Sequence, residues 1–79
     1  MIFIDTGAFI ARYLASDQHH KIAVQTWEKI RLAREPLLTS NFVLDETFTL
    51  LARRADYKFA AEKARLIYTS NSLEILRPN

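Results

Sequence analysis

Short apolar runs alternate with stretches of helical periodicity along this chain. Ile2-Phe3-Ile4 is a continuous run of β-forming residues, which is typical of a strand buried in a parallel sheet. From Thr6 onward, apolar residues recur every three or four positions, which predicts a helix. These residues are Phe9, Ile10, Tyr13 and Leu14. Ser16 or Asp17 can end this helix and cap a second one.

The second predicted helix carries Ala23, Trp27 and Ile30 on one face and runs to about Arg34. It ends before Pro36, because the residue that precedes a proline avoids the helical region. The run 37–39, Leu-Leu-Thr, then predicts a second strand.

The remaining residues continue this alternation. Ser40 or Asn41 can cap a third helix that extends through Arg54, and Asp56 can cap a fourth. The fourth helix places three apolar residues on one face: Ala60, Ala64 and Ile67. The run 73–76, Leu-Glu-Ile-Leu, predicts a third strand. The resulting order is β-α-α-β-α-α-β. Strands joined by helical crossovers pair in parallel, so we predict an α/β fold with a short parallel sheet flanked by helices.

Composition narrows the class of protein. Hydrophobic residues make up 49% of the chain and charged residues 25%, values of a globular domain rather than a disordered segment. The chain has no cysteine, which excludes disulfides and thiolate metal sites and is compatible with a reducing cytoplasm. We expect no signal peptide, because Asp5 interrupts the first apolar stretch, and no transmembrane helix. The net charge of +2 permits an RNA partner.

Two acids stand in apolar surroundings in the sequence. Asp5 follows the first strand directly, at the end where ligands bind in open α/β sheets. Glu46 has Phe42 and Val43 one turn before it and Leu50 one turn after it, so we expect it to point along an apolar stripe. A carboxylate in such a place costs free energy unless a cation, a proton or donors compensate it. If the two acids meet, Mg²⁺ or Mn²⁺ would turn their repulsion into coordination.

Each acid also has a simpler interpretation. Asp5 can cap the helix that starts at Thr6, and this role can coexist with metal binding. Glu46 can lie at the margin of the stripe, where it reaches water or pairs with Arg53 or Arg54. From the residues alone, both interpretations of each acid stay open.

Other polar residues near these acids are weaker candidates. Thr6 can donate its hydroxyl to a carboxylate or a bound water, or it can be an ordinary first-turn residue. Asp45 is a less attractive metal ligand than its neighbour at position 46. Asp17, His19 and His20 lack a further ligand at helical spacing, so a role in starting the helix is the better interpretation.

Arg53, Arg54 and Lys58 form the densest basic group in the sequence. They either compensate the dipole at the end of a helix or contact phosphates of an RNA. Trp27, by contrast, is expected to belong to the core.

In this order and spacing, the motifs resemble the PIN domain family, especially the toxin ribonucleases of the bacterial VapC type. The resemblance runs through the whole chain and rests on six segments: 2–6, Asp17, 20–23, 36–41, 43–47 and 73–76.

The resemblance implies a parallel sheet flanked by helices and an acidic centre that holds Mg²⁺ or Mn²⁺. Asp5 and Glu46 match the first two metal-site acids of the family, so they are the expected metal-binding and catalytic residues, with Thr6 in support. The implied activity is hydrolysis of RNA phosphodiesters by metal-activated water. The implied context is a cytoplasmic toxin–antitoxin system, with RNA as substrate and an antitoxin protein as partner.

The chain also departs from the family pattern. Family members continue past the third strand with two more strands and helices, which carry the remaining metal-site aspartates. After Glu46, the acids Asp56, Glu62 and Glu74 fall at a helix cap, on a helix face and in a strand, and none replaces those aspartates. We therefore expect residues 1–79 to form a single, C-terminally truncated PIN-like domain.

This departure leads to two functional hypotheses. The first is a Mg²⁺-dependent ribonuclease that binds metal weakly and cleaves RNA poorly in this short form. The second is a non-catalytic interaction module that pairs with itself, an antitoxin or a missing half. In the family the first strand is central, so absent strands would expose an edge beside Asp5. On that ground we expect a homo-oligomer.

Overall fold

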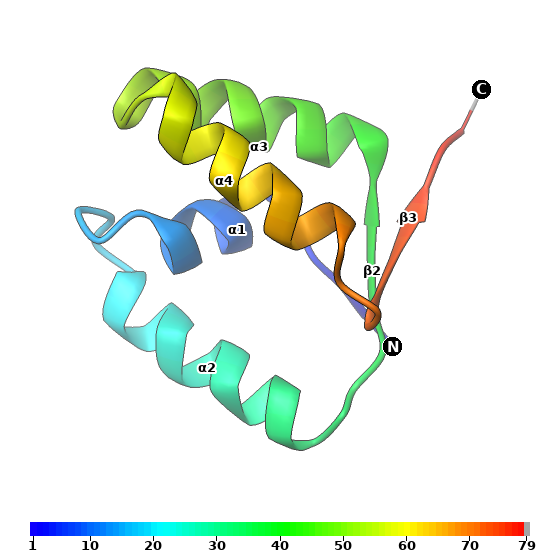
Figure 1. Cartoon of the computed structure of the whole chain (residues 1–79). Coiled ribbons are helices and arrows are strands. Elements are labelled where there is room, and N and C mark those ends of the chain that lie inside the picture. Colours follow the sequence, from blue (N-terminus) through cyan, green and yellow to red (C-terminus); the bar gives the residue numbers. More distant parts are fainter. Residues whose placement is uncertain (79) are drawn as a thin grey trace.

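The computed structural model of the chain describes residues 1–78 (Figure 1). Its strands and helices follow the predicted order β-α-α-β-α-α-β, which confirms the fold class. Their bounds are β1 (Ile2–Phe3), α1 (Thr6–Tyr13), α2 (His20–Leu32), β2 (Leu37–Ser40), α3 (Asn41–Arg54), α4 (Tyr57–Tyr68) and β3 (Leu73–Leu76).

The described strands form one parallel sheet in the order β1-β2-β3, as predicted. Leu37 of β2 pairs with Ile2 of β1 on one side and with Leu73 of β3 on the other. The strand β2 is therefore central and β1 is an edge strand. Because parallel strands share a direction, the carboxyl ends of β1 and β2 lie at the same edge of the sheet.

Side-chain caps explain where three of the helices begin. The Ala8 N–H donates to Asp5 Oδ1 at 2.9 Å at the start of α1. The Ser40 hydroxyl accepts from the Val43 N–H at 3.2 Å, so Ser40 and not Asn41 is the cap of α3. Asp56 caps α4 in the same way, with the Phe59 N–H at 2.7 Å. Each cap satisfies a backbone donor that a helix start leaves without a partner.

The second helix differs from its sequence-based bounds. It begins at His20 without a side-chain cap, because Asp17 instead accepts from the His19 N–H within the preceding turn. It ends at Leu32, two residues before the predicted end. Arg34 then adopts a positive φ of 54°, which turns the chain into β2.

The core lies between the sheet and the helices. Ile4 beyond β1, Phe9 of α1, Leu44 of α3 and Ile67 of α4 form one buried cluster. A second cluster joins the same helices further from the sheet: Ile10, Leu14, Leu51 and Ala60. Trp27 reaches this core from α2 and is half-buried, with its ring 5.7 Å from that of Phe9.

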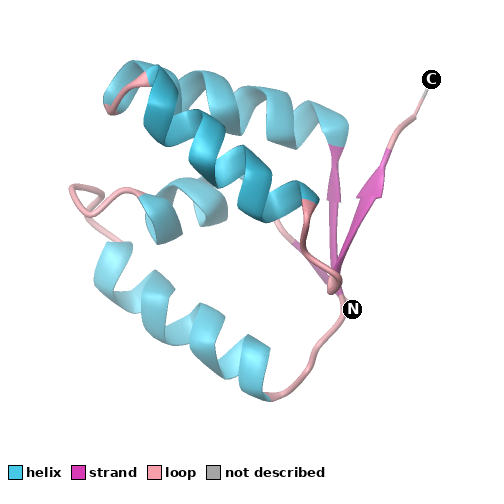
Figure 2. Cartoon of the chain, viewed as in Figure 1, coloured by secondary structure: helices cyan, strands magenta, loops and turns pink. Residues whose placement is uncertain are grey.

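Within residues 1–78, the helices cover one face of the sheet and leave the other bare (Figures 1 and 2). On this side, Phe3 of β1 is 53% exposed and Leu76 of β3 is 43% exposed. Leu38 belongs to β2, the strand between them, and is half-buried. We call this the bare face of the sheet. Parallel sheets usually have both faces covered, so this arrangement among residues 1–78 is uncommon.

Candidate metal and RNA site at the carboxyl edge of the sheet

The backbone holds Asp5 firmly at the carboxyl end of β1. On its N-terminal side, the Ile4 N–H donates to Leu38 O at 2.7 Å, and the buried Thr39 hydroxyl donates to Ile4 O at 2.8 Å. On its C-terminal side α1 begins. Asp5 is exposed, and Oδ1 accepts the capping N–H of Ala8. The simpler interpretation of Asp5 as a cap is thus confirmed, while its second oxygen is left for another ligand.

Glu46 does not point along a buried stripe, and that expectation was wrong. The buried line of α3 is formed by Leu44, Thr47 and Leu51, whereas Glu46 is exposed. Glu46 is two positions from Leu44, which is about 200° around a helix of 3.6 residues per turn. Phe42, which was expected on the same apolar stripe, is 63% exposed. The argument from desolvation therefore fails for both Asp5 and Glu46, since both carboxylates reach water.

The position of Glu46 around α3 follows from its spacing to packed neighbours. The helix contacts both α1 and α4. Phe48 marks the flank toward α4, because its ring lies 5.9 Å from that of Tyr68. Val43 and Leu50 lie on the opposite flank, and Glu46 is next to them around the helix. Helical spacing thus puts Glu46 on the flank of α3 away from Phe48.

Among residues 1–78, neither of these acids forms an ion pair. The ion pairs present are Arg31 with Glu28 and the Met1 amino group with Glu35. Of the two simpler alternatives for Glu46, pairing with Arg53 or Arg54 is not observed in the described part of the chain, whereas exposure to water is.

The donors around the two acids fit a hard cation in type but are few in number. Asp5 and Glu46 offer carboxylate oxygens, and the half-buried hydroxyl of Thr6 follows Asp5 in the chain. The buried Oδ1 of Asn41 has no hydrogen-bond partner, but helical spacing places it on the flank of Phe48, away from Glu46. No group of three or more His, Cys, Asp or Glu that could hold a metal occurs within residues 1–78.

The absence of a metal-holding group within residues 1–78 also applies to the second cluster of candidate ligands, which consists of Asp17, His19 and His20. His20 Nδ1 lies 2.8 Å from the carbonyl oxygen of Ala11, at the end of α1, and Asp17 accepts from the His19 N–H. These contacts shape the turn between α1 and α2. The interpretation of Asp17, His19 and His20 as parts of a helix start is thus supported.

Arg53, Arg54 and Lys58 are exposed around the turn between α3 and α4. Arg53 and Arg54 occupy the last turn of α3, where cations stabilise the helix dipole. Arg53 is seven positions from Glu46, so the two lie on the same face of the helix, two turns apart.

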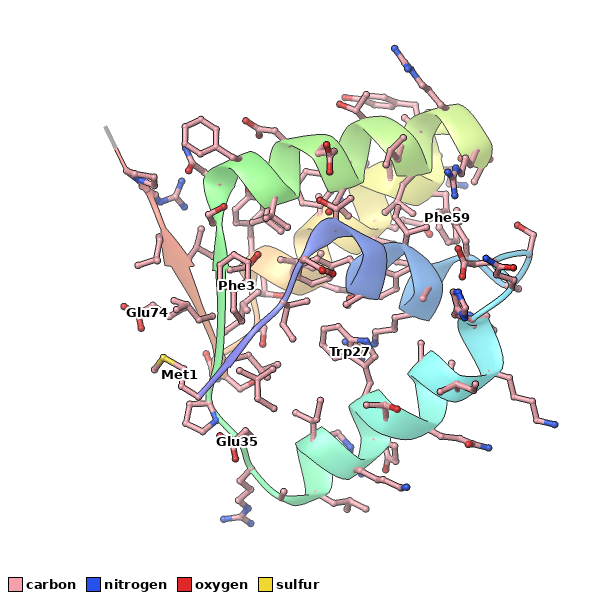
Figure 3. All side chains as sticks on the ribbon, turned by 180° about the vertical axis from the view of Figure 1, so that it is seen from behind. Met1, Phe3, Trp27, Glu35, Phe59 and Glu74 are labelled. Carbon is pink, nitrogen blue, oxygen red and sulfur yellow. The ribbon has the colours of Figure 1, made fainter. Side chains whose placement is uncertain are left out.

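A cavity of about 820 Å³ opens at the opposite, amino end of the strands. Its lining comes from α1, α2, α4 and the strand starts, and it includes Met1, Tyr13, Trp27, Glu35 and Leu73. Figure 3 shows Trp27 projecting from α2 toward α1, and Met1 beside Glu35 at the foot of the strands. Burial raises the pKa of the Tyr13 hydroxyl, and the nearby Arg12 guanidinium partly opposes this.

Comparison with known proteins agrees with this geometry. The PIN domain family matches residues 2–79, almost the entire chain. The chain belongs to the PIN domain family. Its short parallel sheet flanked by helices agrees with the fold that this family implies.

Within this family, the chain is similar to a VapC-type toxin. It is 40% identical over 68 residues to the 23S rRNA-specific endonuclease VapC20 of Mycobacterium tuberculosis, in each of two strains. This match covers 84% of the chain and 48% of VapC20, so the chain spans about half the length of the curated relatives it matches.

A solved structure extends the comparison to three dimensions. The crystal structure of M. tuberculosis VapC20, a Sarcin-Ricin loop cleaving toxin, superimposes with a TM-score of 0.84 and 31% identity. The match covers 100% of this chain and 58% of that one. PIN and VapC proteins generally use a divalent metal ion. In the described part of the chain, no helix has the length and apolar character needed to cross a membrane.

Proposed function

We propose that the chain is a PIN-type, Mg²⁺-dependent ribonuclease, the toxin of a toxin–antitoxin system, and that residues 1–79 by themselves cleave RNA poorly. What supports the proposal is the match to the PIN domain family over residues 2–79, in a chain whose Asp5 and Glu46 are each exposed and without a competing cation among the described residues. Mn²⁺ would be an alternative ion, since both ions prefer oxygen ligands.

The roles of the chain's own residues follow from their positions. Asp5 would hold the ion through Oδ2, because Oδ1 already caps α1. Glu46 would hold it from the flank of α3, and the Thr6 hydroxyl would donate to one of the carboxylates or to a water. When bound, the ion supplies a water of lowered pKa and positive charge beside the phosphate.

We further propose that the affinity for metal is low. Mg²⁺ keeps most of its waters when only one or two carboxylates are available. Two acids also repel each other, by about 4 kcal/mol at 4 Å and an effective dielectric of 20, when no ion lies between them. The chain alone should therefore bind Mg²⁺ weakly and cleave RNA poorly or not at all.

The substrate and partners form part of this proposal. We propose RNA as the substrate, with Arg53, Arg54 and Lys58 as phosphate contacts and the cytoplasm as the location. We also propose a cognate antitoxin as a protein partner. The proposed place for this partner is the apolar cavity between α1, α2 and α4. This cavity lies at the other end of the strands from the acids, so a partner bound there would not cover them.

The test is cleavage of a single-stranded RNA pool by the purified chain in Mg²⁺, in Mn²⁺ and in EDTA, with Asp5→Asn and Glu46→Gln as controls. We expect weak cleavage that needs metal and is lost in both variants. A second series adds a separately expressed C-terminal part of a VapC-type protein, and cleavage should then increase. Cleavage that survives both substitutions would count against this site, and strong cleavage by a monomer would show that further acids are not needed.

A second candidate function is a non-catalytic interaction module that self-associates. The bare face of the sheet favours it, since Phe3, Leu76 and the half-buried Leu38 are uncovered among the described residues. The unpaired edge of β1 adds backbone donors and acceptors. We expect light scattering to show a dimer or larger oligomer, which Phe3→Ser weakens. A stable monomer at high concentration would argue against this function.

A further inference from the structure

The side of α3 that points away from the core carries an ordered row of exposed residues. Phe42, Glu46, Thr49 and Arg53 are all exposed and follow one another at intervals of four, three and four. At helical periodicity these four positions form one line, opposite the buried Leu44. We call this line the outer ridge of α3.

Phe42 stands at the start of the outer ridge, beside the carboxyl end of β2. Its side chain is 63% exposed, and the aromatic contacts of the described residues do not include its ring. The ring precedes Glu46 by one turn, or about 6 Å along the axis at 1.5 Å per residue. A flat apolar ring at this place is suited to stack on a nucleobase, because every base has an aromatic face.

The far end of the outer ridge is basic. Arg53 lies about 10.5 Å beyond Glu46 along the axis. Arg54 and Lys58 are exposed near it, and none of the three cations forms an ion pair within residues 1–78. Such cations attract phosphates, and the ridge leads from them to the candidate site at Glu46, where a bound cation would offset the carboxylate.

We propose that the outer ridge of α3 is a track for single-stranded RNA, in which Phe42 stacks on an unpaired base and Arg53 contacts a phosphate. Phe42 is then a positioning residue that sets which base lies beside the scissile bond. The position of that bond near Glu46 rests on the proposed function, whereas binding of RNA to the ridge does not require cleavage.

The test uses fluorescence anisotropy in EDTA, where cleavage does not interfere. The probes are a short fluorescein-labelled oligoadenylate and an abasic RNA with the same number of phosphates. Phe42→Leu removes the ring but keeps an apolar side chain, and Phe42→Trp keeps the ring. The matched control is Phe3→Leu, since Phe3 is also an exposed phenylalanine but lies on the bare face of the sheet.

We expect Phe42→Leu to weaken binding of oligoadenylate about 10-fold, as expected for one lost base–aromatic stack. Phe42→Trp and Phe3→Leu should bind like the wild type. On the abasic RNA, Phe42→Leu should have no effect. Arg53→Gln should weaken the binding of both RNAs equally and reduce the salt dependence of that binding.

Other outcomes overturn the track. If Phe42→Leu and the wild type bind oligoadenylate with equal affinity, the ring does not stack on a base. The proposed function is tested separately, because it still stands if Glu46→Gln abolishes cleavage. An equal loss on both RNAs would mean that the ring acts on folding, which circular dichroism would detect. A change in self-association without a change in RNA affinity would assign Phe42 to a protein contact. A wild type that binds neither RNA also refutes the track.

Discussion

Asp5 and Glu46, the two proposed metal ligands, are held by two different kinds of support. Asp5 ends a strand, and its backbone is fixed by the sheet on one side and by the first turn of α1 on the other. Its carboxylate also has a structural role as a helix cap. Glu46 lies on the outer part of a helix whose inner part is packed, and its carboxylate has no structural partner among the described residues. We therefore expect that replacing Asp5 by a residue that cannot cap α1 affects folding and metal binding together, whereas replacing Glu46 affects metal binding alone.

The largest expected effect tests whether α3 really turns Glu46 outward. Leu44 is completely buried, so Leu44→Ala should lower the free energy of unfolding by about 2–5 kcal/mol. Glu46→Ala, two residues away on the same helix, should change it by less than about 0.5 kcal/mol. Denaturant unfolding of both variants provides the measurement. Equal destabilisation would show that Glu46 is packed, and the contrast with Asp5 would fail.

The next effect concerns the strand end beside Asp5. Thr39→Val removes the hydroxyl that donates to Ile4 O and should cost about 1–3 kcal/mol, because a buried carbonyl loses its partner. Hydrogen exchange at the amide of Ile4, which donates to Leu38 O, should become faster in this variant. Thr39→Ser keeps the hydroxyl and should retain the protection of this amide. Unchanged exchange in Thr39→Val would mean that the strand end is held by other contacts.

A smaller effect separates the two roles of Asp5. Asp5→Ala should lower the free energy of unfolding by about 1 kcal/mol, since alanine cannot cap α1. Asp5→Asn should leave it nearly unchanged, because asparagine caps a helix as well as aspartate does. Both variants should lose metal binding in a Mn²⁺ titration. Similar thermal unfolding of Asp5→Ala and wild type would show that the cap contributes little.

The smallest effect on stability tests whether the two acids share an ion. Glu46→Gln should change the free energy of unfolding by less than about 0.5 kcal/mol. It should nevertheless weaken the paramagnetic broadening that Mn²⁺ causes at the Asp5 amide in nuclear magnetic resonance spectra. Thr49→Ala, on the same exposed side of α3, is the control. If the broadening at Asp5 is the same in all three proteins, the acids bind metal separately or not at all.

Local signals in the sequence were enough to predict the elements and the position of Asp5. The caps at Asp5, Ser40 and Asp56 start helices where the sequence places them, because a cap acts over three residues. Asp5 was also correctly placed at the carboxyl end of the first strand. The second helix was less well predicted, since no side chain caps it. The chain leaves it through Arg34 at a left-handed φ of 54°, which an arginine does not signal in the sequence.

The face of α3 that is buried could not be read from the sequence. Apolar residues occur nearly all around this helix: Phe42, Val43, Leu44, Phe48, Leu50 and Leu51. Several stripes therefore fit the periodicity, and the one around Glu46 was the wrong choice. The contacts with α1 and α4 select Leu44, Thr47 and Leu51 instead. Thr47 can be buried because its hydroxyl donates to the Val43 carbonyl at 2.7 Å.

The sequence by itself determined the order of the elements, the parallel α/β class and the position of Asp5, because periodicity, caps and strand ends depend on neighbouring residues. Only the tertiary structure decided that Glu46 and Phe42 are exposed, that one face of the sheet is bare in residues 1–78, and that a cavity opens at the far end of the strands. These features depend on how segments that are distant in the sequence pack against each other. A residue is buried by its packed neighbours, and the pattern along one helix or strand does not specify which segments those neighbours come from.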